Sequence, residues 1–319
     1  MAIKLAFSTV ACPDWPSAQV VEKAAEMGYD GIELRTLGPG SSGLACDPAL
    51  GDGTKLRRQF EDGGLTPVCL STSVALHHTD ATAAHRARSE VASCLELAAE
   101  IGCPHIRVFG NEVEPGRNRL SVIQHIAKQT LPLLDTAAAL GVGIMFENAG
   151  SFNKAKEWWW LFNQVDHPML GMCWNAANAA AAGERADVSV PVLNSRIRLA
   201  KVKDTRVGEG SGFVPLGEGT VGIESFVNRL LGIGYDGFIT VEWDRLWLPS
   251  LGPADEFLPE ALKRLRGWLD AAGEIGKKGY SDASPMNKEL KKLLDGAQKA
   301  RQPKQPTDEG AATTPAAGT

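Results

Sequence analysis

The feature of this sequence that most constrains its fold is the regular alternation of short apolar runs with longer stretches of helical period. Each run is five to eight residues long and ends at or near a polar residue, which is typical of strands. Stretches between them, such as "SAQVVEKAAEMG" and "IESFVNRLLGIG", have apolar residues at helical spacing and close on a glycine. The expected strands are 4–9, 31–35, 66–72, 105–110, 143–148, 170–175, 197–204 and 237–243.

Eight strands alternating with helices over about 270 residues predict an α/β fold, a (β/α)8 TIM barrel. A doubly wound open sheet is the alternative, but no G-x-G-x-x-G follows the first strand and the polar strand ends are spread over all eight. We therefore assign residues 1–279 to a barrel domain. Residues 280–319 form a C-terminal tail, in which the composition predicts one lysine-rich helix followed by disorder.

Composition and charge exclude several classes of partner. The chain is 44% hydrophobic and 22% charged, which fits a globular protein with a large core. Its net charge of −5 and the lack of a basic stripe argue against nucleic acid and acidic lipid surfaces as partners. No stretch is apolar enough for a membrane span, and six cysteines without a C-x-x-C pair indicate a reducing compartment. We expect a cytoplasmic protein.

Two lysines stand out at the end of the seventh expected strand, "IRLAKVKD". Lys201 and Lys203 are two residues apart, so they lie on the same side of a strand that otherwise looks interior. Charges that are partly buried require partners of opposite sign. The pattern therefore raises the question of what neutralises these two ammonium groups.

The strand ends resemble a known family. The motifs "GYDGIELR", "FEN", "KVKD", "PLGEGTVGIESF" and "GYDGFITVEWD" occur in the order typical of the sugar phosphate isomerase/epimerase group of xylose isomerase-like TIM barrels, over about residues 4–272. The resemblance implies sugar or polyol substrates and one divalent metal at the barrel mouth. In the family, that metal is held by a glutamate, an aspartate, a histidine and a second glutamate from strands five to eight.

Only half of that metal shell is present here. Glu147 and Glu242 stand at the two glutamate positions, whereas Asn175 replaces the aspartate and Lys201 the histidine. An ammonium has no lone pair for a metal. Two glutamates, an aspartate and a divalent ion sum to −1, as do Glu147, Glu242, neutral Asn175 and a charged Lys201. We therefore expect Lys201 to replace the metal and no cofactor to be needed. If a metal binds, its ligands would be Glu147, Asn175 and Glu242.

These residues predict an isomerase, an epimerase or a related lyase that works by proton transfer next to a carbonyl. Glu147 and Glu242 would be the acid/base pair, and Lys201 would stabilise a developing enediolate oxygen. A Schiff base at Lys201 is less favoured, because adjacent carboxylates keep its amine protonated.

Two other interpretations stay open. In the first, the chain is a noncatalytic sugar-binding or partner-binding barrel that has lost the metal, and Lys201 only neutralises two acids. In the second, it is a metal enzyme with shifted ligands, helped by Asn175, Asn178 or His77.

Several further residues are expected to face a small-molecule sugar or sugar derivative. The arginines would pair with a carboxylate or phosphate, or else clamp neighbouring acids. A histidine would shuttle protons, and tryptophans would pack on the C–H faces of a sugar. Two glycines, Gly217 and Gly219, would cradle a phosphate or simply form a tight loop. The candidate substrate-binding residues are Glu33, Arg35, Arg107, His77, Trp174, Asn175, Lys203 and Trp243.

The run "EWWWLF", residues 157–162, lies on an expected helix. Three consecutive tryptophans on a helix cannot all face one core, so at least one is expected to be exposed or at an interface. This favours a homo-oligomer.

Overall fold

The computed structural model describes residues 3–37, 43–44, 53–207 and 212–277. The chain divides into two compact units, Met1–Leu269 and Asp270–Thr319. The expected tail, residues 280–319, lies outside the described residues, so its helix and its boundary remain predictions.

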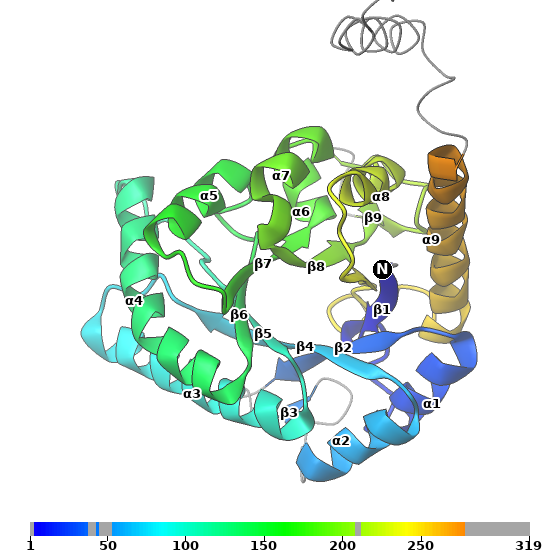
Figure 1. Ribbon diagram of the computed structural model, residues 1–319, viewed down its shortest axis with the longest axis horizontal. Coiled ribbons are helices and arrows are strands. Elements are labelled where there is room, and N and C mark those ends of the chain that lie inside the picture. Colours follow the sequence, from blue (N-terminus) through cyan, green and yellow to red (C-terminus); the bar gives the residue numbers. More distant parts are fainter. Residues whose placement is uncertain (1–2, 38–42, 45–52, 208–211, 278–319) are drawn as a thin grey trace, which may run out of the picture. The chain divides into compact units, whose positions relative to one another are not determined.

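Eight parallel strands close into a barrel, as the sequence predicted (Figure 1). Each strand pairs with its neighbours in chain order, and the last pairs with the first: Lys4 of β1 lies beside Phe238 of β11. All eight expected strands are present within three residues of their expected ends. The barrel strands are β1 (Lys4–Ser8), β2 (Gly31–Leu37), β4 (Thr66–Ala75), β5 (His105–Phe109), β6 (Gly143–Glu147), β7 (Leu170–Asn175), β8 (Ile197–Val202) and β11 (Phe238–Val241).

Short strands extend two of the loops at the carboxyl end of the barrel. Strand β3 (Gly43–Leu44) runs antiparallel to the end of β2. Strands β9 (Asp204–Thr205) and β10 (Phe213–Val214) form an antiparallel ladder after β8.

Helices surround the outside of the barrel (Figure 1). Their ends follow the expected chemistry: Asp80 and Asn118 cap two amino ends with their side chains. Gly102 and Gly141 close two carboxyl ends with φ of 81° and 68°, in the left-handed region that favours glycine. The helices are α1 (Ser17–Met27), α2 (Gly53–Asp62), α3 (Ala81–Ile101), α4 (Arg119–Leu140), α5 (Ala155–Gln164), α6 (Ala176–Ala181), α7 (Ala186–Leu193), α8 (Ile223–Gly232) and α9 (Ala254–Lys277), with 3₁₀ turns at Thr9–Ala11 and Asn194–Arg196.

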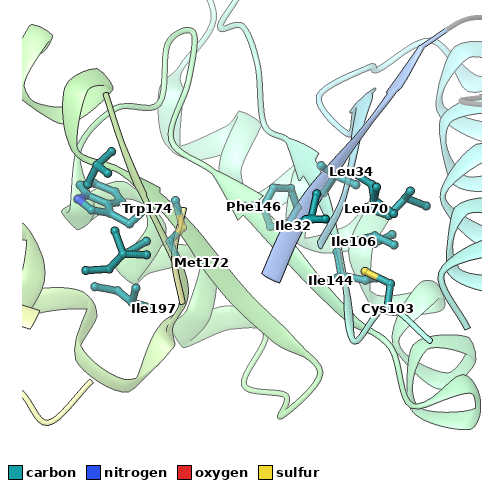
Figure 2. Close-up of a cluster of buried hydrophobic side chains, with 14 of the residues drawn as sticks. Ile32, Leu34, Leu70, Cys103, Ile106, Ile144, Phe146, Met172, Trp174 and Ile197 are labelled. Atoms are coloured by element: carbon teal, nitrogen blue, oxygen red, sulfur yellow. The ribbon is translucent and has the colours of Figure 1, made fainter. Parts of the chain in front are cut away.

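The apolar core has two layers because strand side chains alternate between the two faces of the sheet. One set faces the helices; Figure 2 shows Phe146, Met172 and Trp174 among its members. The other set forms a small separate cluster inside the barrel, made of Ala6, Val68, Cys69, Met145, Cys173 and Leu199. The inner layer is thin, and it leaves the carboxyl end of the barrel to polar side chains.

The tryptophan run behaves as expected on α5. Trp158 is buried, whereas the side chain of Trp159 is 48% exposed. The five described cysteines are buried, and Cys46 lies outside the described residues. None of the described helices has the length and apolar character needed to cross a membrane.

Candidate active site

Buried charged and polar side chains gather inside the carboxyl end of the barrel. Met145, Cys173 and Leu199 belong to the inner apolar layer, and a residue two positions further along a strand points to the same side. The strands therefore place the polar side chains directly above that layer. The three residues at those positions are Glu147, Asn175 and Lys201.

Lys201 lies at the centre of this group. Its Nζ is 3.0 Å from Glu33 Oε1, 3.5 Å from Glu147 Oε2 and 2.8 Å from Glu242 Oε1. The side chain is 1% exposed. Burial opposes the charged form, but Glu147, Glu242 and Glu33 outweigh it and raise the pKa of Lys201 well above its usual value. Lys201 is therefore a buried ammonium held by three carboxylates.

Glu33 supports Lys201 from β2. It is fully buried, and it accepts a hydrogen bond from the Ser71 hydroxyl as well as from Lys201. Its side chain does not line the cavity above the site. Glu33 thus forms a buried ion pair with Lys201 in this structure, and its expected contact with substrate hydroxyls stays a prediction.

Glu147 is held by an ion pair with Arg107 and by hydrogen bonds from Asn175 and Lys201. Arg107 Nε lies 2.9 Å from Glu147 Oε2, and Asn175 Nδ2 donates to Glu147 Oε1 at 3.0 Å. The same Asn175 amide group donates to Glu242 Oε2 at 3.1 Å. Its Oδ1 accepts from the backbone N–H groups that begin α6. Asn175 thus faces both glutamates with its amide hydrogens rather than with its oxygen.

Lys203 continues the charged network toward the cavity. Its Nζ is 2.9 Å from Glu242 Oε2 and 2.8 Å from Asp244 Oδ2. Burial raises the pKa of Glu242, but Lys201 and Lys203 outweigh it and hold this pKa well below its usual value. For Asp244, burial and the neighbouring Glu242 raise the pKa, and Lys203 opposes them. The pKa of Glu242 is therefore lowered, whereas that of Asp244, two residues further on, is raised.

A cavity of about 280 Å³ opens above these residues. Six of the residues singled out in the sequence line it: Arg35, Arg107, Glu147, Asn178, Lys203 and Glu242. The remaining lining residues are Val10, Phe109, Ala149, Asp244 and Trp247.

The comparison with known proteins agrees with this architecture. Residues 21–272 match the family described as Xylose isomerase-like TIM barrel. The chain belongs to this family. None of the curated proteins matches it in sequence.

Solved structures of similar fold include sugar epimerases. The IOLI protein with a bound zinc atom gives a TM-score of 0.73 at 19% identity, covering 85% of this chain and 99% of that one. L-ribulose 3-epimerase gives 0.73 at 16%, covering 89% and 100%. D-allulose 3-epimerase from Methylomonas sp. in complex with D-allulose gives 0.69 at 18%, covering 83% and 97%. At such identities the likeness concerns the fold.

The side chains around Lys201 do not fit the divalent metal that the resemblance to xylose isomerase-like barrels implies. Within the described ranges, no three or more His, Cys, Asp or Glu side chains are grouped to hold a metal ion. The ammonium of Lys201 lies between Glu33, Glu147 and Glu242, and Asn175 presents N–H donors to two of these acids. A cation would face a positive charge and amide hydrogens instead of lone pairs.

Two tryptophans expected at the barrel mouth lie elsewhere. Trp174 is fully buried on the outer face of β7, because it alternates with Asn175 along the strand (Figure 2). Trp243 stacks on Phe257 with ring centroids 3.9 Å apart and donates to the backbone of Gly252. Neither lines the cavity, whereas Trp247 does.

His77 is also not brought to the cavity. Its ring lies against that of His78 in the loop after β4, with centroids 4.2 Å apart and the ring planes tilted by 38°. Burial, and then the positive form of His78, lower the pKa of His77. The expected role as a substrate-binding or metal-assisting residue therefore has no support in the position of this side chain.

The loop with Gly217 and Gly219 is already occupied by a carboxylate of the chain itself. Asp204 accepts from the backbone N–H groups of Gly217 at 2.8 Å, Gly219 at 3.1 Å and Val221 at 3.3 Å. A Cβ at Gly219 would collide with Asp204 Oδ1. The loop is a structural turn, and its donors are not available for a phosphate.

Asp244 is the main site residue that the sequence analysis missed. The signal was present: Glu242 and Asp244 have the same spacing as Lys201 and Lys203, on the neighbouring strand. Two lysines and two acids at period two on adjacent strands predict cross-strand ion pairs.

Proposed function

We propose that this chain is an enzyme that moves a proton next to the carbonyl of a sugar or polyol derivative, as an isomerase, an epimerase or a related lyase. The observation that carries the proposal is the cluster of Glu33, Glu147 and Glu242 around the Lys201 ammonium, at the end of the barrel where active sites of this fold lie. The proteins of similar fold, which include two sugar 3-epimerases, support the same substrate class.

The chemistry requires a base, an acid and positive charge near one oxygen. A carboxylate removes the proton from the carbon next to the carbonyl, and the resulting enediolate is stabilised by nearby positive charge. Glu147 and Glu242 line the cavity and would form the acid/base pair. Lys201 would act through its charge just behind the cavity wall, in the role for which a metal is otherwise used.

Asp244 adds a candidate proton donor. It lines the cavity, and its pKa is raised by burial and by Glu242, whereas the pKa of Glu242 is lowered by the two lysines despite burial. A carboxyl with a raised pKa retains its proton more readily near neutral pH. Asp244 is therefore an alternative to Glu242 as the acid that returns the proton removed by Glu147.

Deuterium exchange tests the proposal even when the product has not been identified. Ketoses and aldoses are incubated with the protein in D₂O, and we expect deuterium at the carbon next to the carbonyl in at least one of them. The exchange should fall at least a hundredfold in Glu147→Gln and be unchanged in Lys128→Met, which alters an exposed side chain on α4. A panel without any exchange would overturn the proposal.

One observation favours the noncatalytic alternative. Every ammonium hydrogen of Lys201 has a carboxylate to face, and the side chain is 1% exposed, as in a purely structural ion cluster. A sugar that binds in the cavity without any deuterium exchange would identify the chain as a sugar-binding barrel.

A further inference from the structure

The cavity at the carboxyl end has three cationic side chains on its wall: Arg35, Arg107 and Lys203. Two of them are neutralised by the chain. Arg107 pairs with Glu147, and Lys203 pairs with Glu242 and with Asp244. These acids therefore have partners before any ligand arrives.

Arg35 differs from the other cations. Among the described residues, no carboxylate lies within ion-pair distance of its guanidinium. The residue is only 7% exposed. A buried guanidinium without a paired carboxylate is unfavourable, because burial removes water from its charge and the more distant Glu33, Glu147 and Glu242 compensate only in part.

The neutral contacts of Arg35 hold its guanidinium in one place. Nη1 donates to the backbone oxygens of Thr36 and Ser71, both at 2.8 Å, and Nη2 donates to Ser73 Oγ at 2.7 Å. Both Nη1 hydrogens are thereby used. Among the residues that the structure describes, none accepts from the Nε hydrogen or from the second Nη2 hydrogen, and two such donors suit an anion with two oxygens.

The electrostatic surroundings of Arg35 also favour an added anion. Burial, and then the nearby Arg107, lower the pKa of Arg35 to about 10, although Glu33, Glu147 and Glu242 oppose this. Trp247 lies beside it, with its ring centroid 5.8 Å from the Arg35 Cζ, and is 54% exposed at the edge of the cavity. A ligand anion would supply the counter-charge that Arg35 lacks.

We propose that the cavity recognises a compact organic anion, with the carboxylate or phosphate of a sugar derivative bound at Arg35. The proposal rests on the proposed function for the sugar-like body of the ligand and adds the charged group. A volume of about 280 Å³ suits a ligand of this size rather than a larger one.

Matched neutral and anionic sugars test the proposal directly by calorimetric titration. The probes are D-glucose, D-glucuronate and D-glucose 6-phosphate, together with the corresponding D-galactose series. In the wild type we expect at least one anionic probe to bind at least tenfold more tightly than its neutral partner. The uronate and the phosphate arms identify which anionic group is preferred.

Three variants assign the preference to Arg35. Arg35→Gln should remove the tenfold preference and leave the binding of neutral sugars unchanged. Arg35→Lys, which retains the charge, should keep part of it. The matched control is Arg198→Gln, an exposed arginine at the opposite end of the barrel, which should keep all of it. The melting temperature of each variant verifies folding, and Arg35→Lys decides the question if Arg35→Gln does not fold.

Three results would overturn the proposal: no anionic probe binds, each anion binds no better than its neutral partner, or Arg35→Gln weakens neutral and anionic probes equally. The deuterium exchange separates this inference from the proposed reaction. Anion binding at Arg35 without deuterium exchange would support the anion site and contradict the proposed proton transfer. Deuterium exchange of neutral sugars without any preference for anions would support the proton transfer and contradict the anion site.

Discussion

The two ends of the barrel enclose different kinds of space. At the amino end, a cavity of about 540 Å³ is lined largely by glycines, prolines and apolar side chains, with His105, Arg198 and Asp236 among the few ionisable ones. At the carboxyl end, a cavity of only about 280 Å³ lies above Lys201 and its three glutamates. The smaller space holds the larger number of buried charges.

This difference shows that cavity volume and buried charge do not go together in this barrel. Burying a charge is unfavourable unless it is paired, so each charged side chain in a buried network needs a partner of opposite charge. At the carboxyl end, the period of two along the strands places charges in register on neighbouring strands. At the amino end, His105 is kept neutral instead, since burial and then Arg198 lower its pKa to about 4.

The largest effect is expected from removing the central charge. Lys201→Met strands three buried carboxylates and should lower the free energy of unfolding by about 3–5 kcal/mol. Urea denaturation measures the loss. Lys128→Met, on the exposed face of α4, is the matched control and should change stability by less than about 0.5 kcal/mol.

A double-mutant cycle tests whether Lys201 and Glu147 act together. Adding Glu147→Gln to Lys201→Met removes one of the stranded charges and should restore part of the stability. Strictly additive effects, or a loss in Lys201→Met no larger than in the control, would show that the carboxyl end does not depend on this ion pair.

The next effect concerns the metal shell that the family implies. Asn175→Asp with Lys201→His replaces an amide and an ammonium by a carboxylate and an imidazole, between Glu147 and Glu242. Calorimetric titration of Mn²⁺ should show binding at least a hundredfold tighter than in the wild type, about 2.8 kcal/mol. Each single change should do much less, because Asn175→Asp alone keeps the ammonium and Lys201→His alone lacks a ligand.

A folded double variant that binds Mn²⁺ no better than the wild type would contradict the alignment of Asn175 and Lys201 with the metal ligands of the family. Comparison of the two single variants then shows which of the two positions is misassigned.

At the amino end, adding a charge should lower stability, because His105 is held in its neutral form. The folded pKa of His105 is about 4, below its ordinary 6.5, so the unfolded chain binds a proton between these values and the folded chain does not. Stability is therefore fully present above about pH 6.5 and falls as the pH drops toward 4, by roughly 2 kcal/mol from this residue. Urea denaturation at several pH values measures it. His105→Gln should have a flatter profile; an identical profile would contradict the burial of this imidazole.

The sequence was sufficient for the fold and for the central residue of the site. Alternation of apolar runs and helical stretches located all eight strands, because buried parallel strands leave a strong pattern. Lys201 was recognised because an ammonium on an interior strand needs acidic partners. Glu147 and Glu242, which contact it, were named from the resemblance.

The residues that were missed or misplaced depend on which face of a strand end they occupy. Trp174 precedes Asn175 directly, so it faces the helices while its neighbour faces the barrel interior. Asp204 ends the same motif as Lys203, yet its carboxylate turns into the following loop. A motif gives the position along the chain, but loop geometry after the strand decides where the side chain lies.

The smallest effect is expected from Arg198, and it separates charge from burial at the amino end. Arg198 is exposed and lowers the pKa of His105 less than burial does. In Arg198→Gln the pKa of His105, followed by NMR titration of the imidazole, should rise but stay below 6.5, its ordinary value. Because the side chain is exposed, stability should change by less than about 0.5 kcal/mol. A return of the pKa to 6.5 would show that charge, and not burial, keeps this histidine neutral. Loss of deuterium exchange in the same variant would show that the amino end contributes to the reaction, which would remove the contrast between the two ends.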